Sequence, residues 1–246
     1  MEKNNKGLLI TLIVLLSFIA ILLSGILVFS ISANTSTFLP IKTKTLCDES
    51  YSAGEISNIS IDSDAGDVIV KTSTDGNIRL VAEGINEDSI EYTADGDTLS
   101  ISSYENLKKW NFFKFRSRNV GTEIILYIPK DFNSLDISLN LGDVEIENEL
   151  NTKLTIENNM GDIDAKVLGG SFNIHTDMGD IEIKRINITD NSSATTSMGD
   201  IEIDKADGIN INAKTSMGNC DVKNNTPSSS IILTAETSMG NVEIND

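Results

Sequence analysis

From residue 131 onward, apolar and polar residues alternate with a period of two, and a glycine interrupts the alternation at regular intervals. After each glycine, apolar residues alternate with acidic ones, as in Met-Gly-Asp-Ile-Glu-Ile at 178–183. Before it, a second alternation runs through positions such as Phe172, Ile174 and Thr176. A period of two is typical of a strand with one buried face. Each repeat therefore predicts two strands joined by a glycine turn.

The turn returns six times, at intervals of about 19 residues. Its glycines are Gly142, Gly161, Gly179, Gly199, Gly218 and Gly240. Leu or Met precedes each glycine and Asp or Asn follows it, which suits a type II turn whose third position needs a positive φ. One unit buries too little apolar surface to offset the entropy of ordering it, so the units must stack. The predicted fold class is all-β, a two-sheet parallel β-solenoid closed at one edge by the glycine turns.

The first third of the chain has a different character. Residues 8–32 are almost entirely apolar and carry no charge, and about 20 such residues span a bilayer as a helix. A secretory signal cleaved near Ala33 is the competing interpretation, although the apolar part of a signal is about 7–15 residues long. We favour an uncleaved transmembrane helix, with the N-terminus cytoplasmic and the C-terminal domain extracytoplasmic.

This gives five predicted segments along the chain. They are a short cytoplasmic N-terminus at 1–7, a transmembrane helix at 8–32, a polar tether at 33–54, an irregular N-terminal β part of the solenoid at 55–130, and the regular Gly-Asp repeat at 131–246.

The formal net charge of −18 excludes a nucleic-acid partner, because neutralising phosphates requires a basic face. The two cysteines, Cys47 and Cys220, are too few for a disulfide framework. Cys220 falls on an inward position of the alternation, so we expect it to be a buried free thiol.

Acidic residues form two columns, one and three residues after each glycine. If the strands stack, carboxylates on one sheet face lie about 4.8 Å apart and repel each other. A lattice of this kind is a weak candidate for divalent cations. Its members are Asp143, Asp162, Asp180, Asp200, Glu182 and Glu202. We favour a solvated face whose Asp and Asn side chains also accept hydrogen bonds from turn amides, and we expect no metal and no cofactor.

Methionine occupies the position before the glycine in five repeats. Thioethers can bind soft metals, but the alternation places these side chains inward, so we expect core residues. The single histidine, His175, falls on an outward position of its strand. No catalytic triad, metal cluster or phosphate loop is present. Repeated carboxylates could in principle cleave glycosidic bonds, but a repeat carries such acids for structural reasons, and we expect no enzyme.

One basic and aromatic segment, 108–118, interrupts the acidic chain and contains its single tryptophan. It either caps the solenoid core or contacts an anionic membrane surface or wall polymer. The candidate contact residues are Lys108, Lys109, Trp110, Phe112, Phe113, Lys114, Arg116 and Arg118.

Several motifs together resemble the bacterial toast-rack family. They are Gly-Asp-Val-Ile-Val at 66–70, Leu-Ser-Ile at 99–101, the stretch 124–128 followed by Pro129, and the repeated Met-Gly-Asp-Ile-Glu-Ile. Members of this family are envelope proteins assigned as adhesins, with a domain of unknown function. The resemblance covers about 50–246 and implies a β-solenoid on the cell surface, often linked with envelope-stress regulation. It implies no catalytic residues that could be assigned to positions of this chain.

Two function classes follow. The first is a non-enzymatic, membrane-anchored module that binds at the cell surface as an adhesin does, with an envelope polymer or a membrane protein as its partner. The alternative is an envelope-stress sensor or regulator, which needs a membrane partner because residues 1–7 are too few to signal alone.

Overall fold

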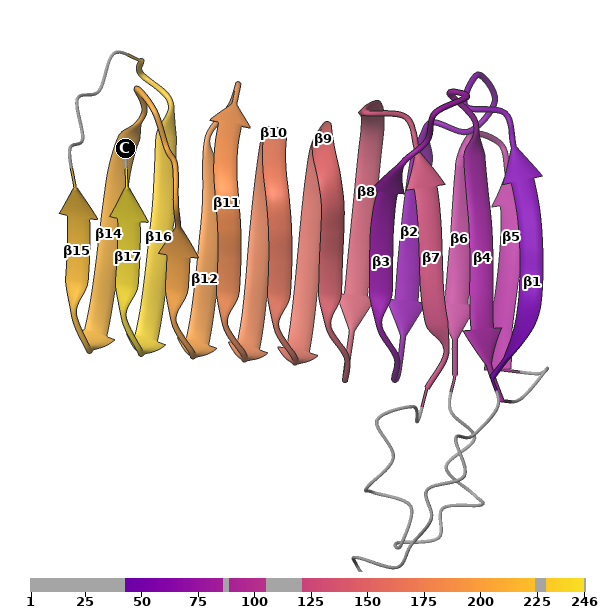
Figure 1. The fold of residues 1–246 in the computed structure, drawn as a ribbon, viewed down its shortest axis with the longest axis horizontal. Helices are drawn as coiled ribbons and strands as arrows, with labels where there is room; N and C mark the ends of the chain where they lie inside the picture. Colours follow the sequence, from indigo (N-terminus) through magenta and orange to yellow (C-terminus); the bar gives the residue numbers. More distant parts are fainter. Residues whose placement is uncertain (1–42, 86–88, 105–120, 224–228, 246) are drawn as a thin grey trace, which may run out of the picture. The chain divides into compact units, whose positions relative to one another are not determined.

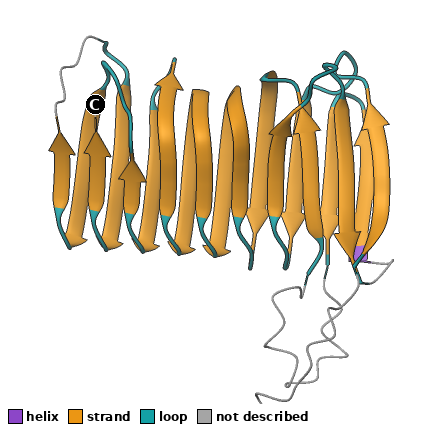
Figure 2. Ribbon diagram, viewed as in Figure 1, coloured by secondary structure: helices purple, strands orange, loops and turns teal. Residues whose placement is uncertain are grey.

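The computed structural model describes residues 43–85, 89–104, 121–223 and 229–245. In these ranges the chain is almost entirely strands joined by short loops (Figure 2). The strands are β1 (Lys44–Tyr51), β2 (Asn58–Ser63), β3 (Val68–Thr72), β4 (Ile78–Gly84), β5 (Ile90–Asp95), β6 (Thr98–Ser103), β7 (Glu123–Ile128), β8 (Asp131–Leu139), β9 (Val144–Met160), β10 (Ile163–Met178), β11 (Ile181–Ile188), β12 (Ser192–Met198), β13 (Ile201–Ile203), β14 (Asn210–Met217), β15 (Cys220–Lys223), β16 (Ile232–Met239) and β17 (Val242–Asn245).

The strands stack as two layers that enclose one core (Figure 1). Sheet A contains β5 and the repeat strands that run towards the glycine turns, in the order β5, β6, β2, β8, the end of β9, the end of β10, β12, β16 and β14. Sheet B contains β1, β4 and the repeat strands that leave the turns, in the order β1, β4, β7, β3, the start of β9, the start of β10, β11, β13, β17 and β15. All neighbours except β1, β4 and β5 are parallel, which confirms the predicted all-β stack of parallel repeats.

The order of the repeats in space differs from their order in the chain at both ends of the stack. We call one strand of sheet A, its glycine turn and the following strand of sheet B a rung. The β2–β3 rung lies between β6–β7 and β8–β9. The β16–β17 rung lies between β12–β13 and β14–β15 (Figure 1). The rung β14–β15 therefore ends the stack, although it is not the last in sequence.

The core consists of the inward side chains of both sheets. Ile174 and Ala194 of sheet A and Ile181 and Ile201 of sheet B are at most 1% exposed. Burying an aliphatic side chain of this size contributes about 1.5–3 kcal/mol. Because each rung shares these contacts with two neighbours, the stack is stable where a single rung is not.

The opposite end of the stack is covered by antiparallel strands. Strand β4 pairs with β7, β1 pairs with β4, and β5 pairs with β6. The predicted tether at 33–54 is therefore wrong for 44–51, because this segment forms β1. An apolar contact holds this segment on the sheet, because Cys47 faces the core opposite Ala82. Burial there raises the pKa of the Cys47 thiol. Arg79 holds β1 from outside through an ion pair with Asp48, 2.7 Å away.

The glycine turns lie along the lower edge of the stack in Figure 1. Gly179 has a φ of +153°, and a side-chain carbon there would lie 2.0 Å from the carbonyl oxygen of Gly161 in the next rung. The prediction of a positive φ is confirmed, but the type II turn is wrong, since that turn needs a φ near +80°. The chain passes from one sheet to the other here, which requires a more extended link than a tight reversal.

A threonine hydroxyl closes the inner corner of four turns. The side chain of Thr176 is fully buried and donates a hydrogen bond to the carbonyl oxygen of Gly161, 3.2 Å away. Thr196, Thr237 and Thr215 make the same bond to the glycine of the neighbouring rung, at 2.9–3.1 Å. Threonine is thus the last inward residue before the turn.

Among the described residues, none belongs to a helix with the length and hydrophobicity that crossing a bilayer requires. The predicted transmembrane helix at 8–32 lies outside these residues.

Candidate functional site

The first acidic column is a hydrogen-bonded ladder. Oδ1 of Asp162 accepts the backbone N–H of Asp180, and Oδ1 of Asp180 accepts that of Asp200, at 2.8 and 2.7 Å. The same bond joins Asp67 to Asp143, Asp143 to Asp162, Asp200 to Asn241, and Asn241 to Asn219. The column therefore serves the turn amides, as the sequence suggested. Within the described ranges, no group of three or more His, Cys, Asp or Glu residues is placed to hold a metal ion.

The second acidic column lies on the outer face of sheet B and is electrostatically strained. Burial, and then the carboxylates of Glu182 and Asp162, raise the pKa of Asp164. Burial, and then Asp204 and Glu182, raise the pKa of Glu202. Lys184 contacts both Glu182 and Asp204, which relieves part of this repulsion. A face of this kind attracts cations in general, without a defined coordination geometry.

The methionine column is exposed, so the prediction that it fills the core is wrong. Met178 and Met198 are about 40% exposed, and Met217 is 62% exposed. Thr176 takes the last inward position before the turn, so the following methionine lies at the rim, beyond the core. Alternation within the strand gave the wrong result because the strand continues to the methionine, whereas the buried core ends at the residue two positions before it.

Cys220 is also exposed, contrary to the prediction of a buried thiol. In the strand register, Cys220 pairs with Val242 of β17 and so occupies an inward position. However, β15 is the end strand of sheet B, so no further rung of the described residues covers it. The exchange in the order of the last two rungs decides this exposure, and the sequence contains no signal for it.

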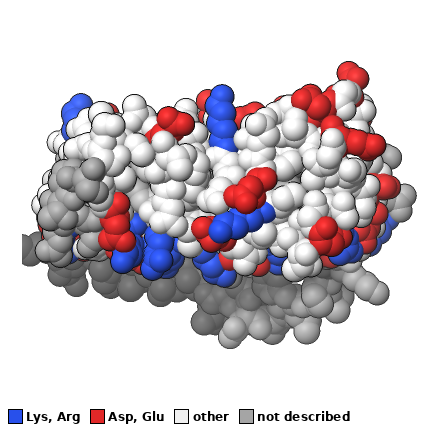
Figure 3. Space-filling view, turned by 90° about the horizontal axis from the view of Figure 1, so that it is seen from above, with Lys and Arg blue, Asp and Glu red and all other residues white. Residues whose placement is uncertain are grey.

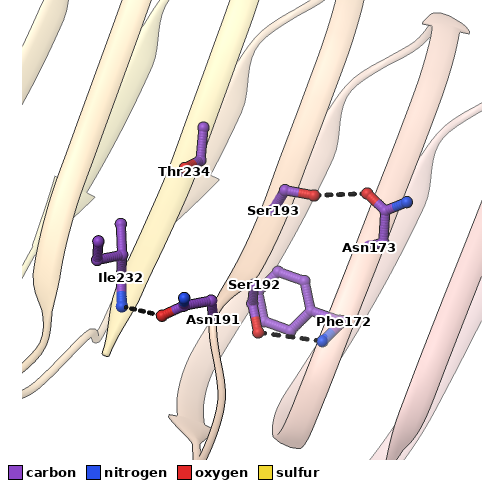
Figure 4. A pocket seen from close by; sticks show the side chains of 7 residues that line it. All are labelled: Phe172, Asn173, Asn191, Ser192, Ser193, Ile232 and Thr234. Carbon is purple, nitrogen blue, oxygen red and sulfur yellow. Dashed lines mark hydrogen bonds between the residues drawn. The ribbon is translucent and has the colours of Figure 1, made fainter. Parts of the chain in front are cut away.

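The outer face of sheet A carries a shallow groove, lined by both polar and apolar groups, across β10, β12 and β16 (Figure 4). It encloses about 370 Å³ and is lined by Phe172, Asn173, Asn191, Ser192, Ser193, Ile232 and Thr234. The Ser193 hydroxyl bonds to the Asn173 side chain, and Oδ1 of Asn191 accepts the backbone N–H of Ile232 at 2.9 Å (Figure 4). The sequence analysis missed this site because its residues come from three repeats and form no contiguous motif.

His175 lies next to this groove on the same face. Its Nδ1 is 2.9 Å from the Thr195 hydroxyl and its Nε2 is 3.2 Å from Oδ1 of Asp177. The outward orientation predicted for this histidine is confirmed, since its side chain is 42% exposed. The ring joins the hydrogen-bonding surface of sheet A.

The edge opposite the glycine turns has a mixed charge. Acidic and basic side chains lie there among uncharged ones (Figure 3). In the links between the sheets, Lys130 pairs with Glu149 at 2.7 Å and Lys205 with Asp207 at 3.0 Å. Among the described residues, this edge therefore offers no extended face of one sign. The basic and aromatic segment 108–118 lies outside the described residues.

The fold and its glycine-turn repeat agree with a known family. The family model Toastrack DUF4097 matches residues 56–245, and the chain belongs to this family. The resemblance found in the sequence is thereby confirmed. No curated protein matches the chain.

Solved structures are similar to the chain at low sequence identity. A "putative cell adhesion protein" from Clostridium sporogenes ATCC 15579 is 13% identical, with a TM-score of 0.50, over 83% of this chain and 99% of that one. A "putative adhesin" from Bacteroides fragilis NCTC 9343 is 19% identical, with a TM-score of 0.39, over 83% and 97% of the two chains. The likeness to the first structure, at 13% identity, shows the fold alone.

Proposed function

We propose that this protein is a non-enzymatic, adhesin-like binding module of the cell surface. In this proposal helix 8–32 anchors it in the membrane, the N-terminus is cytoplasmic, and the solenoid is extracytoplasmic. The relatives described as adhesins and the apolar run at 8–32 support this assignment. The single histidine is engaged in surface hydrogen bonds, which favours binding over catalysis.

The observation that carries the binding role is a row of uncharged polar side chains on sheet A. They lie in register on five adjacent rungs: Thr155, Asn173, Ser193, Thr234 and Asn212. Hydroxyl and amide groups both donate and accept hydrogen bonds. Adjacent strands present them about 4.8 Å apart on one flat face.

Such a row suits a ligand that repeats hydroxyl groups along its length, such as an uncharged polysaccharide. The groove at Asn173 and Ser193 adds the side chain of Ile232, which is 42% exposed and provides apolar surface. A few polar groups beside an apolar patch are typical of ligand sites. The acidic face of sheet B would repel anionic polymers, which favours a neutral one.

Affinity electrophoresis of the full chain tests this function. Gels containing dextran or mannan serve as neutral polymers, and dextran sulfate as an anionic one. We expect a neutral polymer to retard the wild type, and the double variant Asn173→Ala, Ser193→Ala to run free. Ser60→Ala, on the outer face of β2 in the same sheet, is the matched control and should be retarded. Equal retardation of the double variant and of Ser60→Ala would contradict the proposal. So would a wild type that neither neutral polymer retards.

The anchoring and orientation need a separate measurement. The cells are treated so that a protease reaches the outer face of the cytoplasmic membrane while that membrane stays closed. The added protease should then degrade the solenoid. In untreated cells the chain should fractionate with the membranes. A chain that stays soluble, or that resists the protease until the cells are lysed, would refute the proposed topology.

A further inference from the structure

Five methionines form a continuous exposed row along the glycine-turn edge. In the order of the rungs they are Met160, Met178, Met198, Met239 and Met217. Each is at least 40% exposed. Leu141 occupies the same position, 45% exposed, one rung before the row begins. The row is thus a surface feature that the binding face of sheet A does not include.

The backbone of this row is fixed. The carbonyl oxygen of Met178 accepts the N–H of Gly161 at 2.9 Å, and that of Met198 accepts the N–H of Gly179 at 3.0 Å. Met160, Met239 and Met217 are held in the same way by the glycine of the neighbouring rung, at 2.9–3.0 Å. The methionines therefore project from a rigid edge at the spacing of adjacent strands, about 4.8 Å.

Burial does not account for the choice of methionine here. The chain contains six methionines, and the sixth is Met1. The buried core is built from Ile, Leu, Val, Ala and Phe, together with Cys47, and no methionine is among the buried residues of the described ranges. An unbranched thioether normally fills irregular gaps in a core. This chain instead uses it where nearly half of the side chain faces solvent.

The spacing matches a soft metal held between two sulfurs. Thioether sulfur selects soft ions such as Cu(I). With metal–sulfur bonds of about 2.3 Å, the length typical of zinc–thiolate bonds, a linear sulfur–metal–sulfur unit is about 4.6 Å long. Adjacent rungs are about 4.8 Å apart, and three rotatable bonds let neighbouring methionines adjust to this distance.

The surroundings favour a soft cation over a hard one. The carboxylates of Asp162 and Asp180, two residues after the methionines, give the edge a negative potential that attracts cations. Oδ1 of each already accepts a backbone N–H of the turn in the neighbouring rung. We propose that the methionine row binds soft monovalent cations, Cu(I) and its analogue Ag(I), between methionines of adjacent rungs.

The sharpest test changes which methionines are neighbours while removing equal numbers of sulfurs. The double variant Met178→Leu, Met239→Leu leaves Met160, Met198 and Met217, of which no two are adjacent. The double variant Met160→Leu, Met217→Leu leaves three methionines in a continuous run. Leucine is the matched substitute because Leu141 already occupies this position in the fold. All variants carry Cys220→Ser, since an exposed thiol would bind the same ions.

Isothermal titration of the full chain with silver nitrate, in chloride-free buffer, gives the readout. We expect the variant with isolated methionines to lose affinity for Ag(I) by about tenfold or more, because each ion loses one of its two ligands. The variant with the continuous run should keep wild-type affinity at a lower capacity. Calcium nitrate should not compete. Circular dichroism checks that both variants fold.

Two outcomes would overturn the proposal. If both variants lose affinity equally, adjacency has no role and the sulfurs act singly. If neither variant differs from the Cys220→Ser parent, the row binds no soft cation, and an apolar contact that leucine preserves remains as its role.

Discussion

The backbone N–H of Asp180 donates a hydrogen bond to Oδ1 of Asp162, 2.8 Å away in the neighbouring rung. The relationship repeats along the edge, so each acidic side chain acts as the acceptor for the next turn. The repeated Asp of this family motif is explained by this geometry, and a cation is not required.

Replacing Asp180 separates its hydrogen-bonding role from its charge. Asp180→Ala leaves the N–H of Asp200 without its acceptor and should lower the free energy of unfolding by about 1 kcal/mol. Asp180→Asn keeps the acceptor and should cost less, as Asn241 and Asn219 already fill this position in other rungs. Urea unfolding measures both. Equal losses would indicate that charge, and not the hydrogen bond, sets the residue at this position.

Gly179 is required for a steric reason besides its φ. Gly179→Ala should destabilise the solenoid by about 1–3 kcal/mol or more, since the new carbon would lie 2.0 Å from the carbonyl oxygen of Gly161. Gly76→Ala is the matched control: its φ is also positive, at +75°, but nothing lies within 4 Å of the added carbon. Thermal melts compare them. An equal drop in Tm would mean that backbone strain alone explains the glycine.

The strained carboxyl of Asp164 makes stability depend on pH. Its folded pKa is raised above the ordinary 3.8, so the folded state holds the proton more tightly than the unfolded chain. The stability contributed by this group is therefore present at low pH and is lost as pH rises through the folded pKa. Asp164→Asn should raise Tm at pH 7 and have little effect near pH 3. Asp190→Asn, exposed and outside the column, is the control. A gain that persists at low pH would contradict this origin.

The two cysteines should differ in reactivity. Cys220 is exposed on the end strand β15, whereas Cys47 is buried under β1 and burial raises the pKa of its thiol. A thiolate is the reactive form, so a disulfide reagent at pH 8 should label Cys220 rapidly and Cys47 after denaturation. The single variants Cys220→Ser and Cys47→Ser identify the modified residue. Rapid labelling of Cys220→Ser would show that β1 detaches readily from β4.

The groove on sheet A illustrates a limit of the sequence analysis. Asn173, Ser193 and Thr234 lie in register in the structure but are about 20 and 40 residues apart in the chain, so no local motif joins them. The acidic ladder, in contrast, was predictable, because each Asp stands directly after its glycine and turn amides need acceptors.

The sequence by itself determined the all-β class, the strand period, the glycine turns and the outward acidic columns. These follow from local alternation and from the positive φ at glycine, and both are properties of neighbouring residues. The tertiary structure decided which repeats touch: β16–β17 lies inside the end of the stack, Cys220 is exposed, and 44–51 pairs as a strand. It also placed the methionines at the rim, since a buried Thr ends the core one step before them. Every repeat carries the same inward pattern, so local chemistry cannot distinguish one neighbour from another.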